Sequence, residues 1–167
     1  MTEGRPMRVL KVAVSIALLW GLSTVNADER KVLTIKGTVL ASIPCVINAD
    51  QPIDAAFGDV QTAFIDGVYK TITLDYTLDC KRAGTNQLRL QIKGSIAGFD
   101  PQLLLVPGRP GLGIALKKDN ARLGVNTWSD FDSGKVPLLQ AVLVKQPGSD
   151  IESGAFKASA TLVVDYR

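Results

Sequence analysis

The hydrophobic and polar positions of this chain alternate in short runs, which is the pattern of β-strands. Near the C-terminus every second residue is apolar, so these side chains lie together on one face of a strand. Because the sequence stops at Arg167, we expect no following hairpin strand to cover this face, so the strand needs a partner from an earlier segment or from another protein. The apolar positions are Phe156, Ala158, Ala160, Leu162, Val164 and Tyr166.

Short extended segments separated by Gly, Pro, Asn and Asp make up most of the chain before this strand. In the strictest of them, apolar side chains from Ile72 to Cys80 share one face, and nothing has the spacing of a long amphipathic helix. Six or seven such strands predict one antiparallel sandwich domain and no second domain. The expected strands cover residues 31–39, 38–47, 71–80, 88–92, 103–106, 112–116 and 136–146.

The first residues have the pattern of a secretion signal. Arg5, Arg8 and Lys11 precede an apolar run at residues 12–22, and Val25 and Ala27 fit a cleavage site after Ala27. The alternative is an N-terminal membrane anchor, but the run is shorter than the roughly 20 residues that span a bilayer. We therefore expect residues 1–27 to be a cleaved signal peptide and the protein to be exported.

Charge argues against a nucleic-acid partner. The whole chain has 19 basic and 16 acidic residues, and cleavage after Ala27 removes three of the former and one of the latter. The 140 residues that remain have a net charge of about +1, with no basic cluster or aromatic-basic stripe of the kind that binds nucleic acid. They also contain no second apolar stretch long enough to cross a membrane, so no membrane insertion is expected after cleavage.

The two cysteines, Cys45 and Cys80, are expected to form one disulfide, because an even pair in an exported protein is typically bridged. Metal binding is the alternative, but the chain has no histidine and no CxxC motif, so we expect no metal site. An antibody-type immunoglobulin domain would place a core Trp between its cysteines. Trp128 follows both, so a standard domain of that type is not expected.

The sequence contains no recognisable catalytic constellation. Without histidine, Ser-His and Cys-His nucleophile pairs cannot form. The glycine-rich stretch at residues 107–113 lacks the GK[ST] ending of a phosphate-binding loop, and we interpret it as a turn. Residues 130–134 lack the ligand spacing of a calcium loop, and we interpret them as a solvated loop. No catalytic residue and no cofactor are expected.

Several of these residues together resemble the subunits of chaperone-usher fimbriae, the pilins of Gram-negative bacteria. The resemblance covers residues 28–167. It implies an all-β, incomplete immunoglobulin-like antiparallel sandwich that lacks its last strand, with a hydrophobic groove in its place. It rests on Cys45 and Cys80 about 35 residues apart, Phe57-Gly58-Asp59-Val60, Leu112-Gly113-Ile114-Ala115-Leu116, Gly154 and the penultimate Tyr166.

The resemblance also implies how such a groove is filled. A periplasmic chaperone lends a strand, which the N-terminal extension of a neighbouring pilin subunit replaces at the outer-membrane usher. The C-terminal carboxylate of Arg167 would be anchored by basic residues of the chaperone. The implied acceptor edge comprises Gly154, Phe156, Ala158, Ala160, Leu162, Val164, Tyr166 and Arg167, and the implied donor strand Leu33, Ile35 and Gly37.

The resemblance divides the chain into a signal peptide at 1–27, an N-terminal donor-strand extension at 28–38 and a pilin domain at 39–167. Glu29 and Lys31 share the donor face, where a groove would prefer apolar groups. The expected function is a structural subunit of a surface fimbrium, most similar to the minor tip or adaptor subunits of P-type pili and contributing to cell adhesion. One alternative is an ordinary edge strand in a complete sandwich; another is a single-domain secreted adhesin that binds a host glycan or protein.

Overall fold

The computed structural model describes residues 33–37 and 45–167, and the chain separates into two units, 1–39 and 40–167. The predicted signal peptide and the predicted boundaries after residues 27 and 38 lie outside the described residues, as do residues 38–44 of the strand expected at 38–47. Of the strand expected at 31–39, the structure describes residues 33–37, and these do not form a strand. In the first unit, the side chains of Leu33 and Ile35 are 82% and 85% exposed.

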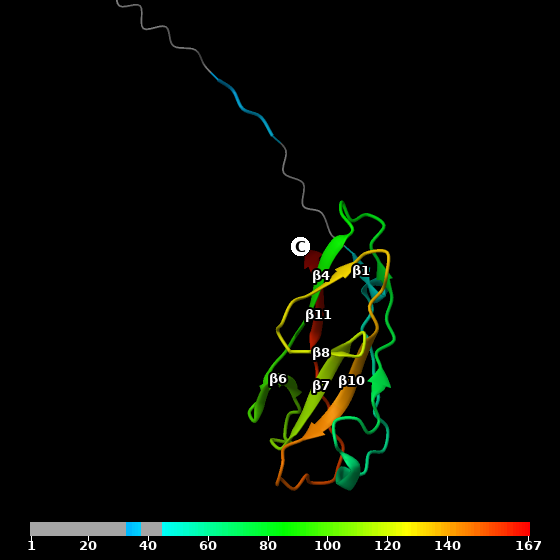
Figure 1. Cartoon of the computed structure of the whole chain (residues 1–167), viewed down its shortest axis with the longest axis vertical. Helices are drawn as coiled ribbons and strands as arrows, with labels where there is room; N and C mark the ends of the chain where they lie inside the picture. Colours follow the sequence, from blue (N-terminus) through cyan, green and yellow to red (C-terminus); the bar gives the residue numbers. More distant parts are fainter. Residues whose placement is uncertain (1–32, 38–44) are drawn as a thin grey trace, which may run out of the picture. The chain divides into compact units, whose positions relative to one another are not determined.

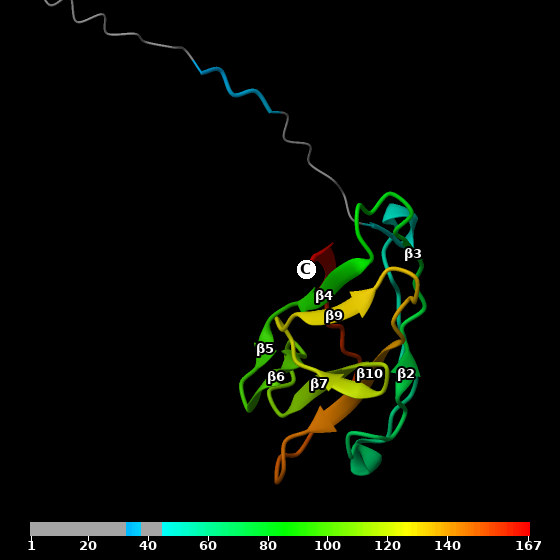
Figure 2. The same cartoon turned by 45° about the horizontal axis from the view of Figure 1, so that its top comes forward.

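Residues 45–167 form antiparallel β-sheets with two single-turn 3-10 helices (Figures 1 and 2). No helix in the described ranges is long and apolar enough to cross a membrane. In chain order the elements are β1 (Val46–Ile47), η1 (Asn48–Asp50), η2 (Thr62–Phe64), β2 (Ile72–Thr73), β3 (Leu78–Asp79), β4 (Gln87–Lys93), β5 (Ile96–Ala97), β6 (Asp100–Leu105), β7 (Leu112–Lys118), β8 (Ala121–Leu123), β9 (Ser129–Asp132), β10 (Leu139–Lys145) and β11 (Thr161–Tyr166).

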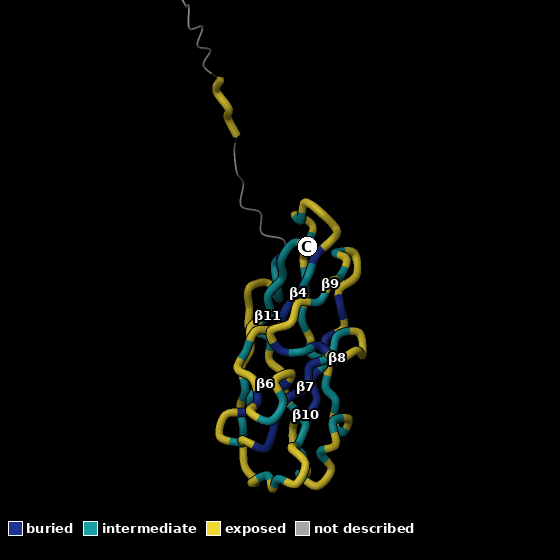
Figure 3. Tube along the Cα trace, turned by 60° about the vertical axis from the view of Figure 1, so that its left-hand side comes forward, coloured by how far each residue is buried: buried dark blue, intermediate teal, exposed yellow. Residues whose placement is uncertain are grey.

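The largest sheet has the order β2-β10-β7-β6-β5, with β8 added beside β7. Its centre is the ladder between β7 and β10, which runs from Leu112 opposite Lys145 to Lys118 opposite Leu139. These two strands are buried on both faces, which explains why the sequence is almost continuously apolar there (Figure 3). One face joins the main core, and the other packs against Ala97 and Leu103.

The second layer is a three-stranded sheet of order β11-β4-β9. Leu88, Leu90 and Ile92 alternate along β4 and point into the core, where they are at most 5% exposed. The register places Leu162 opposite Ile92 and Tyr166 opposite Leu88, so the apolar face of β11 continues the same surface. The inner faces of the two sheets therefore form the sandwich core that the alternation predicted, with the immunoglobulin-like fold that the resemblance implied.

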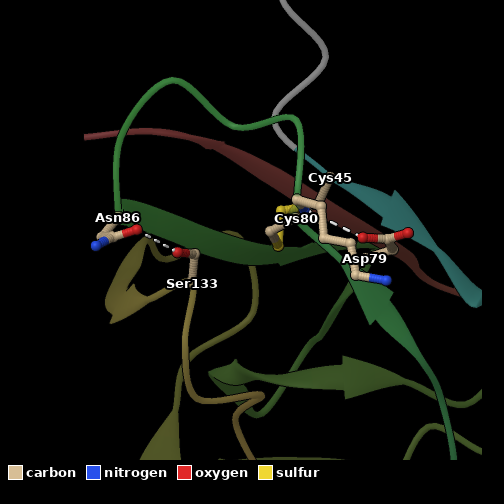
Figure 4. The surroundings of a disulfide bond; sticks show 6 residues. Cys45, Asp79, Cys80, Asn86 and Ser133 are labelled. Carbon is tan, nitrogen blue, oxygen red and sulfur yellow. Dashed lines mark hydrogen bonds between the residues drawn. A yellow bond between two sulfur atoms is a disulfide. The ribbon is translucent and has the colours of Figure 1, made fainter.

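The predicted disulfide between Cys45 and Cys80 is present (Figure 4). It lies beside a two-residue ladder in which Val46 of β1 is opposite Asp79 of β3. The bridge closes a loop with a sequence separation of 35, for which the chain-entropy account gives a stabilisation of about 3–4 kcal/mol. It therefore fixes the start of the domain to the chain just before β4.

Two predicted strands are shorter in the structure than the alternation indicates. Residues 71–80 keep the expected alternation of burial, but only β2 and β3 within them are strands, because β2 pairs with β10 whereas β3 pairs with β1. The terminal strand begins at Thr161 rather than Phe156, since its partner β4 ends at Lys93. The chain then turns at Gly94, where a Cβ would lie 2.5 Å from Leu104 Cδ1.

The sequence predicted a solvated loop at residues 130–134, but the first part of this acidic stretch is a strand. Ser129–Asp132 form β9, which pairs with β4 and places Phe131 opposite Leu88. Asp130 and Asp132 remain exposed on the outer side of this strand. The strand β9 therefore pairs with β4 although Phe131 is its single apolar residue beside three polar ones. Alternation over so few residues is too short to distinguish a strand from a loop.

The neighbours Leu138 and Leu139 provide a matched test of the core. Leu139 is 1% exposed whereas Leu138 is 40% exposed. Leu139→Ala is therefore expected to lower the free energy of unfolding by about 2–5 kcal/mol. Leu138→Ala is expected to change it by only about 0.5 kcal/mol. Urea denaturation followed by fluorescence measures both, and equal effects would contradict the assigned register of β10.

Candidate functional site

An apolar groove with a volume of about 980 Å³ opens along the sandwich. Residues 53–60 line one side, and residues 154–160, which lead into β11, line the other. Its floor is made of buried core side chains, none more than 6% exposed. They come from both sheets: Ile92, Leu104, Ile114, Leu116, Leu139 and Ala141. The groove therefore reaches down to the buried core between walls of half-buried and exposed residues.

The wall at residues 154–160 carries most of the residues predicted for the acceptor edge. Gly154, Phe156, Ala158, Ala160 and Leu162 all line the groove. Between residues 154 and 160 no backbone–backbone hydrogen bond is found within the described part of the chain. Buried strands normally satisfy these groups. This stretch therefore presents free N–H and C=O groups beside an apolar floor, which is the geometry that an added strand needs.

Arg109 anchors the start of this wall. Its guanidinium donates to the carbonyl of Ser153 at 3.2 Å and pairs with Glu152 at 3.4 Å. Gly154 follows with a φ of +129°, and a Cβ there would lie 2.8 Å from Arg109 Nη2. A side chain at Gly154 would therefore meet both backbone strain and the anchoring guanidinium.

The opposite wall was not identified as part of the site from the sequence. Phe57 faces Phe156 across the groove, with ring centroids 6.1 Å apart and planes tilted by 40°. Ile53 and Val60 are half-buried on the same side. Residues 53–60 have no regular alternation, so periodicity gave no signal. The stretch from Phe57 to Val60 had entered only through the family resemblance.

Tyr76 closes one flank of the groove and ties it to the large sheet. Its hydroxyl donates to the carbonyl of Pro137 at 2.7 Å, and the nearby Leu74 N–H donates to the carbonyl of Leu139 at 2.9 Å. Burial, with a smaller contribution from the charge of Asp119, raises the pKa of Tyr76 to about 12. The phenol therefore stays neutral while it holds this flank in place.

The remaining predicted acceptor residues lie beyond the groove, at the end of β11. Val164 packs against the core and Tyr166 is half-buried opposite Leu88. The guanidinium of Arg167 pairs with Asp130 at 3.1 Å. These three residues therefore hold the strand rather than line the groove.

A row of charges on the outer face of the same sheet fixes the register of β11. Asp165 accepts a hydrogen bond from Arg89 at 2.8 Å, and this contact, followed by the N–H of Tyr166, lowers the pKa of Asp165. Arg89 also lies over the ring of Trp128, 4.5 Å from its centroid. Exposed ion pairs of this kind contribute little to stability individually, so their effect is to hold β11 in its register against β4.

The predicted donor residues Leu33, Ile35 and Gly37 belong to the first unit. The two apolar side chains are exposed, and nothing lies within 4 Å of a Cβ placed at Gly37. Their role stays a prediction. Among the described residues no group of three or more metal-ligating side chains is found.

The raised pKa of Tyr76 predicts an alkaline transition. The folded state keeps the phenol proton above the ordinary pKa of 10, so its contribution to stability is full below pH 10 and is lost as pH rises to about 12. Ultraviolet titration of phenolate should show one late tyrosine that disappears in Tyr76→Phe. Titration of Tyr76 at its ordinary pKa in the folded protein would contradict the burial of its hydroxyl.

Comparison with known proteins places these features in a family. The family model described as "Fimbrial protein" matches residues 33–167. The chain is 31% identical over 163 residues to the fimbrial-like protein YfcR of Escherichia coli K12, covering 95% of this chain and 94% of the relative. It is also 31% identical over 147 residues to the fimbrial-like protein YfcQ of the same organism, covering 84% and 89%.

Solved structures agree with this assignment. The P pilus rod subunit PapA matches with a TM-score of 0.57 and 26% identity, covering 83% of this chain and all of that one. The P pilus adaptor subunit PapF matches with a TM-score of 0.55 over 76% of this chain and 98% of that one, and at 21% identity it supports the fold alone. With its open sandwich, its disulfide and its match to the family model over residues 33–167, the chain belongs to the fimbrial protein family, as a pilin of the chaperone-usher class.

Proposed function

We propose that this pilin accepts a β-strand in its apolar groove and donates residues 28–38 to the groove of a neighbouring subunit. The observation that carries the proposal is the groove itself, whose floor consists of core side chains and whose wall at 154–160 has an unpaired backbone. A strand laid there would complete the sandwich. Polymer growth by strand addition needs an open groove on the accepting subunit and a free apolar strand on the donating subunit.

The donor segment fits the groove in chemistry. Leu33 and Ile35 are separated by two positions, so both would face the floor of the groove, and burying each stabilises by roughly 1.5–3 kcal/mol. Each hydrogen bond to the wall at 154–160 would add about 0.5–1.5 kcal/mol net. Gly37, without a side chain, would allow close approach of the two backbones. These gains oppose an association cost of roughly 4–15 kcal/mol.

A groove that reaches the core needs a partner strand before a neighbouring subunit is available. We therefore assign a periplasmic chaperone and the outer-membrane usher as partners, following a signal peptide at 1–27 and leading to the cell-surface fimbrium. The terminal carboxylate of Arg167 is assigned to basic residues of the chaperone. Pairing of the Arg167 guanidinium with Asp130 supports this, because it offsets the positive charge beside that carboxylate.

Replacing one donor residue should block incorporation into the fibre without affecting binding to the chaperone. Ile35→Asp places a charge on the donor face, whereas Thr34→Asp places it on the opposite face and serves as the control. Both variants should form a one-to-one complex with the chaperone on co-expression in a bacterial periplasm, measured by size-exclusion chromatography. Only Ile35→Asp, like deletion of 28–37, should fail to enter the fibre.

Incorporation of the 28–37 deletion at the wild-type level would show that another segment is the donor. Well-behaved monomers in the absence of any chaperone would show that the sandwich is complete, and they would move the assignment to a free-standing secreted domain. A chaperone complex that forms with wild type but not with Thr34→Asp would show that the N-terminal segment contributes to chaperone binding.

Within the fibre we assign a minor position at the tip or as an adaptor, where the subunit contributes to cell adhesion. Residues 112–116 and the Tyr166-Arg167 ending support this by resemblance. The TM-scores of 0.57 to a rod subunit and 0.55 to an adaptor do not separate the two positions. Immunogold labelling should find a few copies near one end of each fibre, and labelling along its whole length would overturn the minor position.

A further inference from the structure

We propose that the turn at residues 61–70, here called the apolar turn, is the docking surface for the folded domain of the subunit that donates its strand. The occupant is a second copy of this chain, which contacts the apolar turn through the end of its domain that carries Cys45. This inference rests on the proposed function, because it requires strand donation. It adds a contact between folded domains that lies outside the groove.

The apolar turn is held in one conformation. After η2, the carboxylate of Asp66 accepts hydrogen bonds from the N–H groups of Val68 at 2.8 Å and Tyr69 at 2.7 Å. The carbonyl of Val68 then accepts from the N–H and hydroxyl of Thr71. The ammonium of Lys70 donates to the carbonyl of Asp59, which ties the turn to the groove wall. A surface of fixed shape loses little entropy on docking.

This fixed turn exposes large apolar side chains. Phe64 is 56% exposed and Val68 is 68% exposed. Phe64 also packs edge-on against Tyr69, with ring centroids 5.7 Å apart. Exposed aromatic side chains on a rigid frame are typical of the anchors of protein interfaces, whereas singly scattered apolar residues need no partner. The clustering of these side chains therefore indicates that a partner protein binds over them.

The apolar turn lies at one end of the groove. The wall at 53–60 runs directly into it, and a Cβ at Gly67 would be 3.8 Å from Val144 near the end of β10. Figures 1 and 2 show η2 at the end of the sandwich away from the C-terminus, with the loop that follows β10. The start of the other wall, at Gly154, belongs to the same end, because residues 154–160 lead from there toward the C-terminus.

Strand direction decides where the donating domain sits. An antiparallel added strand is the more stable choice beside 154–160, and every pairing already in the sandwich is antiparallel. Such a strand runs toward Gly154 and leaves the groove beside the apolar turn. Residues 38–44 alone separate Gly37 from Cys45, so at most about 29 Å of chain joins the donated strand to its own domain. That domain must therefore lie against this end.

The end of the domain around Cys45 has a complementary surface. The disulfide places residues 45–50 next to the loop at 81–86, which begins with the exposed Lys81 and Arg82 (Figure 4). The apolar turn offers aromatic faces together with Asp66, and Asp59 lies beside it. Guanidinium and ammonium groups bind both to aromatic faces and to carboxylates. Asp50 and Asp79 lie at the same end as Lys81 and Arg82, and Lys70 lies in the apolar turn, so the match is between individual groups and not between net charges.

The test compares binding of an isolated strand with binding of the whole donor. A labelled synthetic peptide of residues 28–44 and the full chain are each titrated, as competitors of the chaperone, against the one-to-one chaperone complex of an acceptor that is wild type, Phe64→Ser/Val68→Ser or Val136→Ser. Val136 is 48% exposed on the segment between β9 and β10 and controls for loss of an exposed apolar group. Equal yields of the one-to-one chaperone complex for the three acceptors establish equal folding.

The double variant should bind the peptide as wild type does and the full chain about tenfold more weakly, since removing an interface anchor typically has an effect of this order. A photoreactive phenylalanine analogue at Phe64 should cross-link to residues 45–50 or 81–86 of the second copy. Unchanged full-chain binding, or cross-links near the C-terminus of that copy, would overturn the docking surface alone. Failure of the peptide to bind wild type would overturn strand donation as well.

Discussion

The fold depends on a hydrophobic core that its own sheets do not fully cover. Leu90 and Leu139, from opposite layers, are each 1% exposed and belong to one core cluster, yet side chains of the same cluster form the floor of an open groove. The groove is also lined by half-buried apolar side chains such as Phe156 and Leu162, and removing their exposed surface from water stabilises the fold. Whatever fills the groove therefore contributes to the folding of the subunit, and not only to its attachment.

This constraint links stability to partners. A strand that binds only the folded state stabilises it in proportion to the logarithm of its concentration relative to its dissociation constant. In the proposed assembly that strand comes first from a chaperone and then from a neighbour, so each subunit would complete its core from outside at every stage. The unpaired backbone at 154–160 sets the position of the strand, and the apolar floor supplies most of the driving force.

The domain is fastened most firmly at the end away from the apolar turn. The Cys45–Cys80 disulfide, the ladder of β11 with β4 and the charge row of Asp165 and Arg89 all lie there. At the other end Arg109 holds the start of the wall at 154–160 through Ser153 and Glu152, and Lys70 holds the wall at 53–60 through the carbonyl of Asp59. An incoming strand therefore meets a wall with few internal bonds to break, beside a sheet that is already rigid.

The sequence by itself determined the elements whose signals are local. Alternation in β4 and β11 predicted which of their side chains face the core, and the continuous apolar runs of β7 and β10 predicted strands covered on both faces. The cysteine pair in an exported chain predicted the bridge, and the combination of motifs indicated the family. The tertiary structure decided where pairing stops. Residues 71–80 divide between two sheets, and the terminal strand loses its partner at Gly94. The wall at 53–60 has no period of its own and becomes part of the site only because Phe57 meets Phe156. Pairing and groove walls depend on residues distant in sequence, and no local pattern encodes such contacts.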